Sequence, residues 1–150
     1  MNQATTTNKE CIDVCNSLLR GERSAVETYD KAIEKFGSEH DVSALRSIRN
    51  DHSKAVSQLM NNVRDMGGTP DVDSGAWGTF ANAVQATANL FGTESALESL
   101  EQGEKKGRSD YQDALENDDV LPECKAMIRN DLLPKIEQHL GRLKQLQDEA

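Results

Sequence analysis

The segment GERSAVETYDKAIE (residues 21–34) occurs a second time in this chain, in changed form, as GEKKGRSDYQDALE (residues 103–116). The Gly-Glu pair, the tyrosine seven residues after the glutamate and the closing Ala-Ile/Leu-Glu keep the same spacing in both copies. Apolar residues in and around each copy recur every three or four positions, which is typical of one face of a helix. The repetition therefore predicts two related helical units.

The repeat continues into the segment that follows each copy. The run IRND at residues 48–51 recurs at residues 128–131, and Gln58 corresponds to Gln138. Helix-breaking residues separate the two parts of each unit, at 37–38 and 117–119. We expect four helices, over residues 9–36, 41–66, 93–116 and 121–147, paired as two hairpins. Pro134 should kink the last helix.

The segment between the hairpins, residues 67–92, is too long for a tight turn. It opens on the helix-breaking run GGTP and continues with an apolar stripe from Trp77 to Phe91. We expect a short crossover helix here, with Trp77 as its anchor on the bundle. A crossover that runs the length of a bundle predicts an all-α, ferritin-like four-helix bundle. A simple up-down-up-down bundle is the alternative.

Length and charge limit the domain count and the partners. A chain of 150 residues suits one core, which we assign to residues 9–150, with residues 1–8 expected to be disordered. The net charge of −9, without a basic run, disfavours nucleic acid and anionic membranes as partners. Neither a secretory signal nor a stretch of roughly 20 apolar residues is present, so we expect a cytoplasmic protein.

Two glutamates fall on positions that should face the core. Glu22 shares a heptad line with Tyr29 on the first helix, and Glu104 shares the matching line with Tyr111 on the third. Gly21 and Gly103 precede these glutamates and cost helix propensity, so we expect a close helix contact beside them.

Two histidines also point inward, because His52 and His139 share heptad lines with leucines. Counting the helical rise from each hairpin turn puts Glu22, His52 and Glu104 within roughly 6 Å of one another along the bundle axis. The same count displaces His139 by roughly 8 Å, toward the level of Tyr29.

Inward glutamates need a metal ion, a shared proton or hydrogen bonds, because an unpartnered buried carboxylate is costly. We favour a metal-free polar layer in which the glutamates bond to the tyrosines and histidines and fix helix register. The alternative is an iron or manganese site, for which carboxylates and imidazoles on facing helices are suitable ligands. The candidate ligands are Glu22, His52, Glu104, Asp51, Asp131 and His139, and the tyrosines of the polar layer are Tyr29 and Tyr111. A di-iron Glu-x-x-His motif is missing, since Arg49 and Ile136 stand where its glutamates would be.

Three cysteines leave one unpaired, and Cys11 and Cys15 lie four residues apart on a helix, where the geometry suits a disulfide poorly. We expect Cys11, Cys15 and Cys124 to be reduced and buried as small hydrophobic residues, with a redox or metal role as the lesser alternative. Haem is disfavoured, because the Cys-x-x-Cys-His motif is missing.

The repeated Gly-Glu/Tyr spacing, the Asp51-His52 pair, the GGTP break before Trp77 and the closing helix with His139 resemble a known family. This is the bacterial ferritin-like family catalogued as domain of unknown function 2383. The resemblance covers residues 11–146 and implies a ferritin-like bundle without an established reaction.

Relatives in the wider ferritin-like superfamily bind two metal ions for oxygen chemistry or iron storage. By position, only Glu22 and Glu104 match the carboxylates that the first and third helices supply in those relatives, and Asp51 and Asp131 would be shorter substitutes. We therefore expect a non-catalytic protein, although the sequence leaves catalysis undecided. A homodimer is compatible with this class of bundle, but no second apolar stripe marks the interface.

Overall fold

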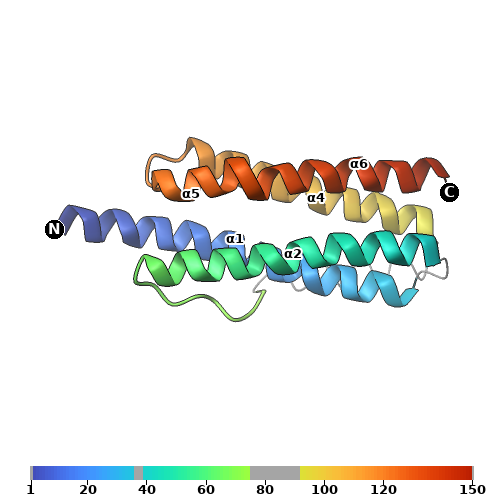
Figure 1. The fold of residues 1–150 in the computed structure, drawn as a ribbon, viewed down its shortest axis with the longest axis horizontal. Coiled ribbons are helices and arrows are strands. Elements are labelled where there is room, and N and C mark those ends of the chain that lie inside the picture. Colours follow the sequence, from blue (N-terminus) through green and yellow to red (C-terminus); the bar gives the residue numbers. More distant parts are fainter. Residues whose placement is uncertain (1, 36–38, 75–91, 150) are drawn as a thin grey trace.

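The computed structural model describes residues 2–35, 39–74 and 92–149 and confirms an all-α helical bundle (Figure 1). The first hairpin consists of α1 (Asn2–Lys35) and α2 (Glu39–Asp65). The second consists of α4 (Thr93–Glu116) and a composite rod of α5 (Pro122–Met127), the π turn η2 (Ile128–Leu132) and α6 (Leu133–Glu149). Contacts between α1 and α4, and between α2 and α6, join the hairpins.

The two hairpins are joined across the length of the bundle. In Figure 1, α2 runs from right to left and so does α4, so the end of α2 and the start of α4 lie at opposite ends of the molecule. Residues 66–92 must span that length, as the sequence predicts. The expected crossover helix and its anchor Trp77 lie outside the described residues.

The first part of this connection, residues 66–74, turns back along α1. The side-chain amide of Asn16 donates to the Thr69 carbonyl (3.1 Å), and its oxygen accepts from the Asp71 backbone N–H (2.9 Å). Gly68 permits this approach, because a Cβ there would lie 2.7 Å from Cγ2 of Ile12. The helix-breaking run therefore fits the surface of α1 closely.

The first and last helices differ in detail from the expected ones. α1 begins at Asn2, seven residues before the expected start, but its first buried residue among those described is Cys11. Disorder of residues 1–8 stays a prediction. A π turn, Ile128–Leu132, lies shortly before Pro134, whose missing N–H and ring disfavour the ordinary helical hydrogen bond to the carbonyl four residues earlier. The kink at Pro134 itself stays a prediction. Within the described helices, no stretch is long and apolar enough to cross a membrane.

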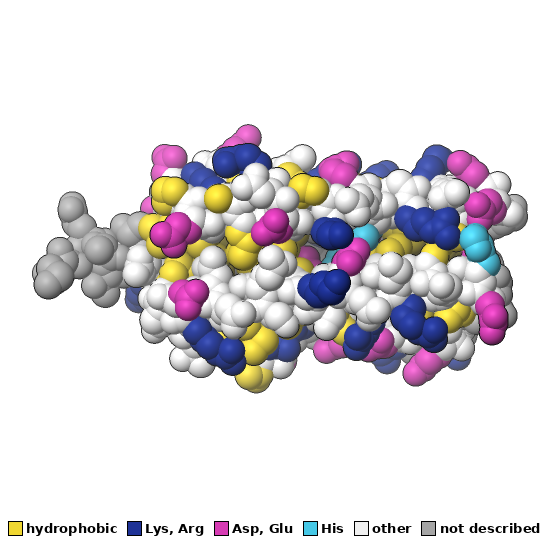
Figure 2. Space-filling view, viewed as in Figure 1, with side chains coloured by type: hydrophobic (Ala, Val, Ile, Leu, Met, Phe, Trp, Pro, Cys, Tyr) yellow, Lys and Arg dark blue, Asp and Glu magenta, His cyan; other side chains and the backbone are white. Residues whose placement is uncertain are grey.

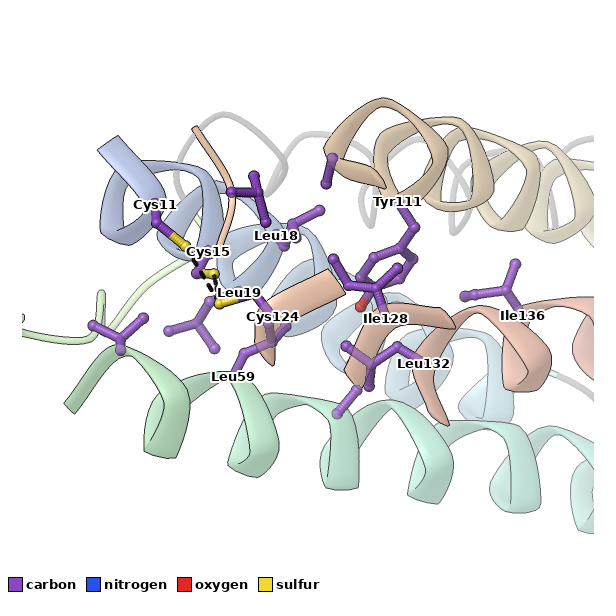
Figure 3. Close-up of a cluster of buried hydrophobic side chains, with 14 of the residues drawn as sticks. Cys11, Cys15, Leu18, Leu19, Leu59, Tyr111, Cys124, Ile128, Leu132 and Ile136 are labelled. Carbon is purple, nitrogen blue, oxygen red and sulfur yellow. Dashed lines mark hydrogen bonds between the residues drawn. The ribbon is translucent and has the colours of Figure 1, made fainter. Parts of the chain in front are cut away.

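The core consists of two apolar clusters with polar side chains between them. One cluster contains the three cysteines and the side chains of Leu19, Leu59 and Ile128 (Figure 3). The other contains Leu45 and Leu97. The polar side chains between the clusters come from all four rods of the bundle.

Candidate functional site

Five ionisable side chains meet near the middle of the bundle, and each rod contributes at least one. Glu22 comes from α1, Asp51 and His52 from α2, Glu104 from α4, and His139 from α6. Glu22 is 6% exposed, Glu104 and His139 are 3% exposed, and His52 is 4% exposed. The inward orientation predicted for the two glutamates and two histidines is therefore confirmed.

The Glu104 carboxylate is the centre of this cluster. Its Oε2 lies 2.7 Å from His52 Nε2, and its Oε1 lies 3.0 Å from His139 Nδ1. Tyr29 donates its hydroxyl to Oε2 at 2.6 Å. The two imidazole rings lie 4.8 Å apart between centroids. One nitrogen of each histidine therefore converges on a single carboxylate.

The other nitrogen of each histidine points to a different carboxylate. His52 Nδ1 lies 2.6 Å from Glu22 Oε2, and His139 Nε2 lies 2.9 Å from Asp51 Oδ2. Tyr111 donates its hydroxyl to the remaining Glu22 oxygen at 2.7 Å. Each imidazole is thus held between two carboxylates, and its orientation is fixed from both sides.

The surrounding charges shift the pKa values of the buried groups. Burial lowers the pKa of His52, but the carboxylates of Glu104 and Glu22 outweigh that effect and raise it well above its ordinary value. Burial raises the pKa of Glu104, but His52 and His139 lower it to about 2. Glu104 is therefore an ionised carboxylate at neutral pH.

The tyrosines and glutamates connect the two hairpins reciprocally. Tyr29 of the first hairpin bonds to Glu104 of the second, and Tyr111 of the second bonds to Glu22 of the first. Burial and the adjacent carboxylates raise the pKa of both tyrosines, so both hydroxyls stay protonated donors. The repeated sequence motif thus forms a pseudo-symmetric pair of contacts, as the polar-layer interpretation predicted.

The histidines do not follow this symmetry. In the spacing that relates the second and fourth helices, His52 corresponds to Leu132, and His139 corresponds to Leu59. The cluster is therefore one asymmetric centre, in which both histidines contact Glu104 and His52 also contacts Glu22.

The structure differs from expectation at His139 and at Asp131, both on the last rod. The roughly 8 Å displacement expected for His139 does not keep it from the cluster, because its Nδ1 lies 3.0 Å from Glu104 Oε1. The π turn adds about one residue to a turn and so accounts for only about 1.5 Å of that displacement. Asp131 lies within this π turn and is exposed, with its carboxylate 3.5 Å from Gln58 Nε2. The structure places it outside the central cluster.

A cavity of about 370 Å³ connects the cluster with the gap between α2 and the last rod. Glu22, Asp51 and both histidines line it, with Asp131 and other polar residues farther out. Figure 2 shows histidine atoms (cyan) in a hollow on this face. Small ions and water therefore have a polar route to the cluster.

A smaller space of about 60 Å³ lies between α1 and α4. Gly21, Gly103 and Gly107 line it, together with Tyr29 and Tyr111. Gly107 is in ordinary contact with the last rod, since a Cβ there would lie 3.8 Å from a methyl of Ile136. The glycines thus leave room beside the glutamates.

A second group of chemically active side chains lies in the apolar cluster of Figure 3, where Cys11, Cys15 and Cys124 come together. Burial of all three cysteines, expected from the sequence, is confirmed. Their mutual contact was not predicted, because Cys124 is far along the chain and only tertiary packing brings it to α1.

Comparison with protein families matches residues 10–117 to the family described as Domain of unknown function (DUF2383). The matched segment includes Glu22, His52 and Glu104, whereas His139 lies beyond it. No curated protein and no solved structure gives a significant match.

Proposed function

The chain belongs to this family of unknown function, and we propose that it is a ferritin-like bundle that binds one divalent iron or manganese ion between His52, His139 and Glu104. The observation that carries the proposal is the convergence of His52 Nε2 and His139 Nδ1 on one carboxylate, at 2.7 and 3.0 Å. One ligand atom from each of these three residues lies within 4.8 Å of the others, and all three residues are buried.

The groups behind the histidines support metal binding. A histidine that binds a metal ion usually donates its other N–H to a carboxylate or carbonyl, which fixes the ring and raises its basicity. Glu22 accepts from His52 and Asp51 accepts from His139 in this way. Glu22 and Asp51 are therefore positioning residues in the proposal, and the inner nitrogens remain for the metal.

The donor set and its spacing suit iron or manganese. Two imidazoles and one carboxylate on one side of a metal ion are the ligands of many non-haem Fe(II) sites. Adjacent ligands about 2.1 Å from an octahedral ion lie about 3.0 Å apart. The two nitrogens lie 2.7 and 3.0 Å from different oxygens of the Glu104 carboxylate, and one ligand atom from each residue lies within 4.8 Å of the others, so the three side chains would have to adjust to reach this spacing.

The charge of the cluster favours a divalent ion. His52 is held between Glu22 and Glu104, and despite its burial their carboxylates raise its pKa well above the ordinary value. A divalent ion that displaces the inner proton of His52 changes the net charge of the cluster by +1, and the carboxylate of Glu104 lies beside it to compensate that charge.

A metal-free polar layer is the second candidate function, and it makes the protein a non-catalytic bundle. The observation in its favour is that the cluster satisfies its own polar atoms. Over the described residues, Gln147 Nε2 is the one buried side-chain nitrogen or oxygen without a hydrogen-bond partner. Such a layer would fix helix register without binding a ligand.

Elemental analysis of untagged protein purified without chelators separates the two candidates. The proposal predicts about one iron or manganese ion per chain, or uptake of one added ion, and its loss in a His139→Gln variant. His40→Gln is the matched control, because His40 is exposed and contacts only Glu149 among the interactions of its side chain that the structure shows. If the wild-type protein remains metal-free after addition of Fe(II) or Mn(II), the metal proposal fails and the metal-free polar layer is the remaining candidate.

A further inference from the structure

The three cysteines of the chain form a compact group near the end of the bundle. Cys11 and Cys15 come from successive turns of α1, and Cys124 comes from α5. Cys124 Sγ lies 3.3 Å from Cys11 Sγ and 3.8 Å from Cys15 Sγ. The exposed fractions are 0% for Cys11 and Cys15 and 1% for Cys124.

A fourth donor atom faces the same point from α2. The side-chain oxygen of Asn62 lies 3.1 Å from Cys124 Sγ and 4.0 Å from Cys15 Sγ. Three helical elements thus direct three sulfur atoms and one amide oxygen toward one place (Figure 3 shows the cysteines).

We propose that Cys11, Cys15 and Cys124, completed by the Asn62 oxygen, form a structural site for a soft divalent cation of the zinc class. In a tetrahedral site with Zn–S bonds of about 2.3 Å, neighbouring sulfurs lie about 3.8 Å apart. Two of the three sulfur–sulfur separations, 3.3 and 3.8 Å, match that spacing to within about half an ångström, and all three sulfurs lie within 4.8 Å of one another. An oxygen about 2.1 Å from the same ion would lie about 3.6 Å from each sulfur, which falls between the two Asn62 distances.

Simple packing explains less of this arrangement. Neutral thiols form weak hydrogen bonds, so packing alone gives little reason to direct three of them and a carboxamide at one point. A disulfide would join two of the sulfurs and would give no reason for the position of the third. The Leu121 N–H also points at Cys11 Sγ, at 3.4 Å, and backbone N–H groups of this kind stabilise metal-bound thiolates.

The charge of the site selects the ion. Each thiol loses its proton on binding, so three thiolates and one divalent ion carry a net charge of −1. A monovalent ion such as Cu(I) would leave −2 in a buried place, which costs more to bury. Thiolate sulfur also discriminates against Mn(II) and Mg(II), which prefer oxygen donors. This site and the His/Glu site therefore select different metals.

The position of the site gives it a structural role. The bound ion would tie the segment 11–15 of α1 to α2 and to α5, which directly follows the loop between the halves of the second hairpin. An ion that binds only the folded form of the protein stabilises that form by mass action. The proposal does not depend on metal binding at His52, His139 and Glu104.

Titration of the reduced full-length protein with Co(II) under argon tests the site, because thiolate ligands give cobalt an intense near-ultraviolet charge-transfer absorption that imidazole and carboxylate do not. The expected result is a band that saturates at about one equivalent, disappears on addition of Zn(II) and is missing in Cys124→Ser. Asn62→Ala should weaken binding by about tenfold or more, whereas Asn61→Ala, at the exposed neighbouring position, should not.

A folded, reduced wild-type protein without the band would overturn the proposal, and so would a band that persists in Cys124→Ser. If Cys124→Ser does not fold, alkylation of the wild-type protein tests the site instead. Stoichiometric Zn(II) should protect all three cysteines together from iodoacetamide, as counted by mass spectrometry. Equal labelling with and without Zn(II) would contradict the site.

Discussion

Competition between protons and metal at the His/Glu site predicts a steep pH dependence of metal affinity. Each imidazole nitrogen in the cluster lies 2.6 to 3.0 Å from a carboxylate oxygen. Burial lowers the pKa of His52, but the carboxylates of Glu104 and Glu22 raise it well above its ordinary value, so His52 Nε2 carries a proton near neutral pH. Metal binding to this nitrogen removes that proton, so at least one proton leaves for each metal ion that enters.

The magnitude follows from that count. Release of one proton makes the association constant rise about tenfold per pH unit, which is about 1.4 kcal/mol of binding free energy. The affinity should therefore increase with pH, as long as both rings keep their outer hydrogen bonds to Glu22 and Asp51. Mn(II) is the suitable probe, because the cysteine cluster disfavours it.

Calorimetric titration of Mn(II) at several pH values between about 6 and 7 measures this slope directly, and buffers of different ionisation enthalpy count the released protons. The His40→Gln variant should give the same slope as the wild type. A slope near zero, or a proton count below one, would refute the reasoning, because the inner nitrogens would then not be the metal ligands.

Three further predictions concern stability. The pKa of Glu104 is lowered to about 2 from 4.5, so its ionised form stabilises the folded protein by about 3 kcal/mol above pH 4.5. This contribution is lost as the pH falls toward 2. Urea unfolding of metal-free protein across that range measures the loss, and a free energy of unfolding that does not change with pH would contradict it. Tyr29→Phe removes a hydrogen bond to that carboxylate and should lower the free energy of unfolding by about 1.5–3 kcal/mol, whereas an unchanged urea midpoint would argue against the contact. Gly68→Ala should lower the free energy of unfolding by about 1–3 kcal/mol, because the new Cβ would lie 2.7 Å from the stiff side chain of Ile12. Gly141→Ala on α6 should raise it by about 1 kcal/mol, because nothing lies within 4 Å of the new Cβ. Thermal melts that showed the opposite order would be inconsistent with this packing.

The sequence was sufficient to predict the inward polar residues. Heptad spacing places Glu22, Glu104, His52 and His139 on the core face, because helix geometry alone decides which side of a helix a residue occupies. The burial of all four confirms that prediction. The two Tyr–Glu contacts were also predictable, because the repeat places a tyrosine two turns after each glutamate.

Height along the bundle was less predictable than orientation. The level of His139 depends on how many residues each turn of the last rod contains, and the π turn at residues 128–132 changes that number. Pro134 indicated an interruption there, but not its form. Asp131 lies within the same turn and outside the cluster, although its repeat partner Asp51 belongs to it.

Contacts between distant segments were the hardest to predict. Cys11 and Cys15 are recognisable as neighbours on one helix, but Cys124 lies 109 positions after Cys15 in the sequence. Only the packing of α5 against α1 brings these sulfurs together. Asn62, an ordinary polar residue in the sequence, joins them for the same reason.

Anomalous diffraction from crystals grown with Mn(II) tests the central claim most directly. Data collected at the manganese absorption edge should show one strong peak per chain, bounded by His52 Nε2, His139 Nδ1 and the Glu104 carboxylate, with Glu22 and Asp51 still bonded to the outer nitrogens. No peak at that position, with both imidazoles still hydrogen-bonded to Glu104, would contradict the metal-binding account and leave a structural polar layer.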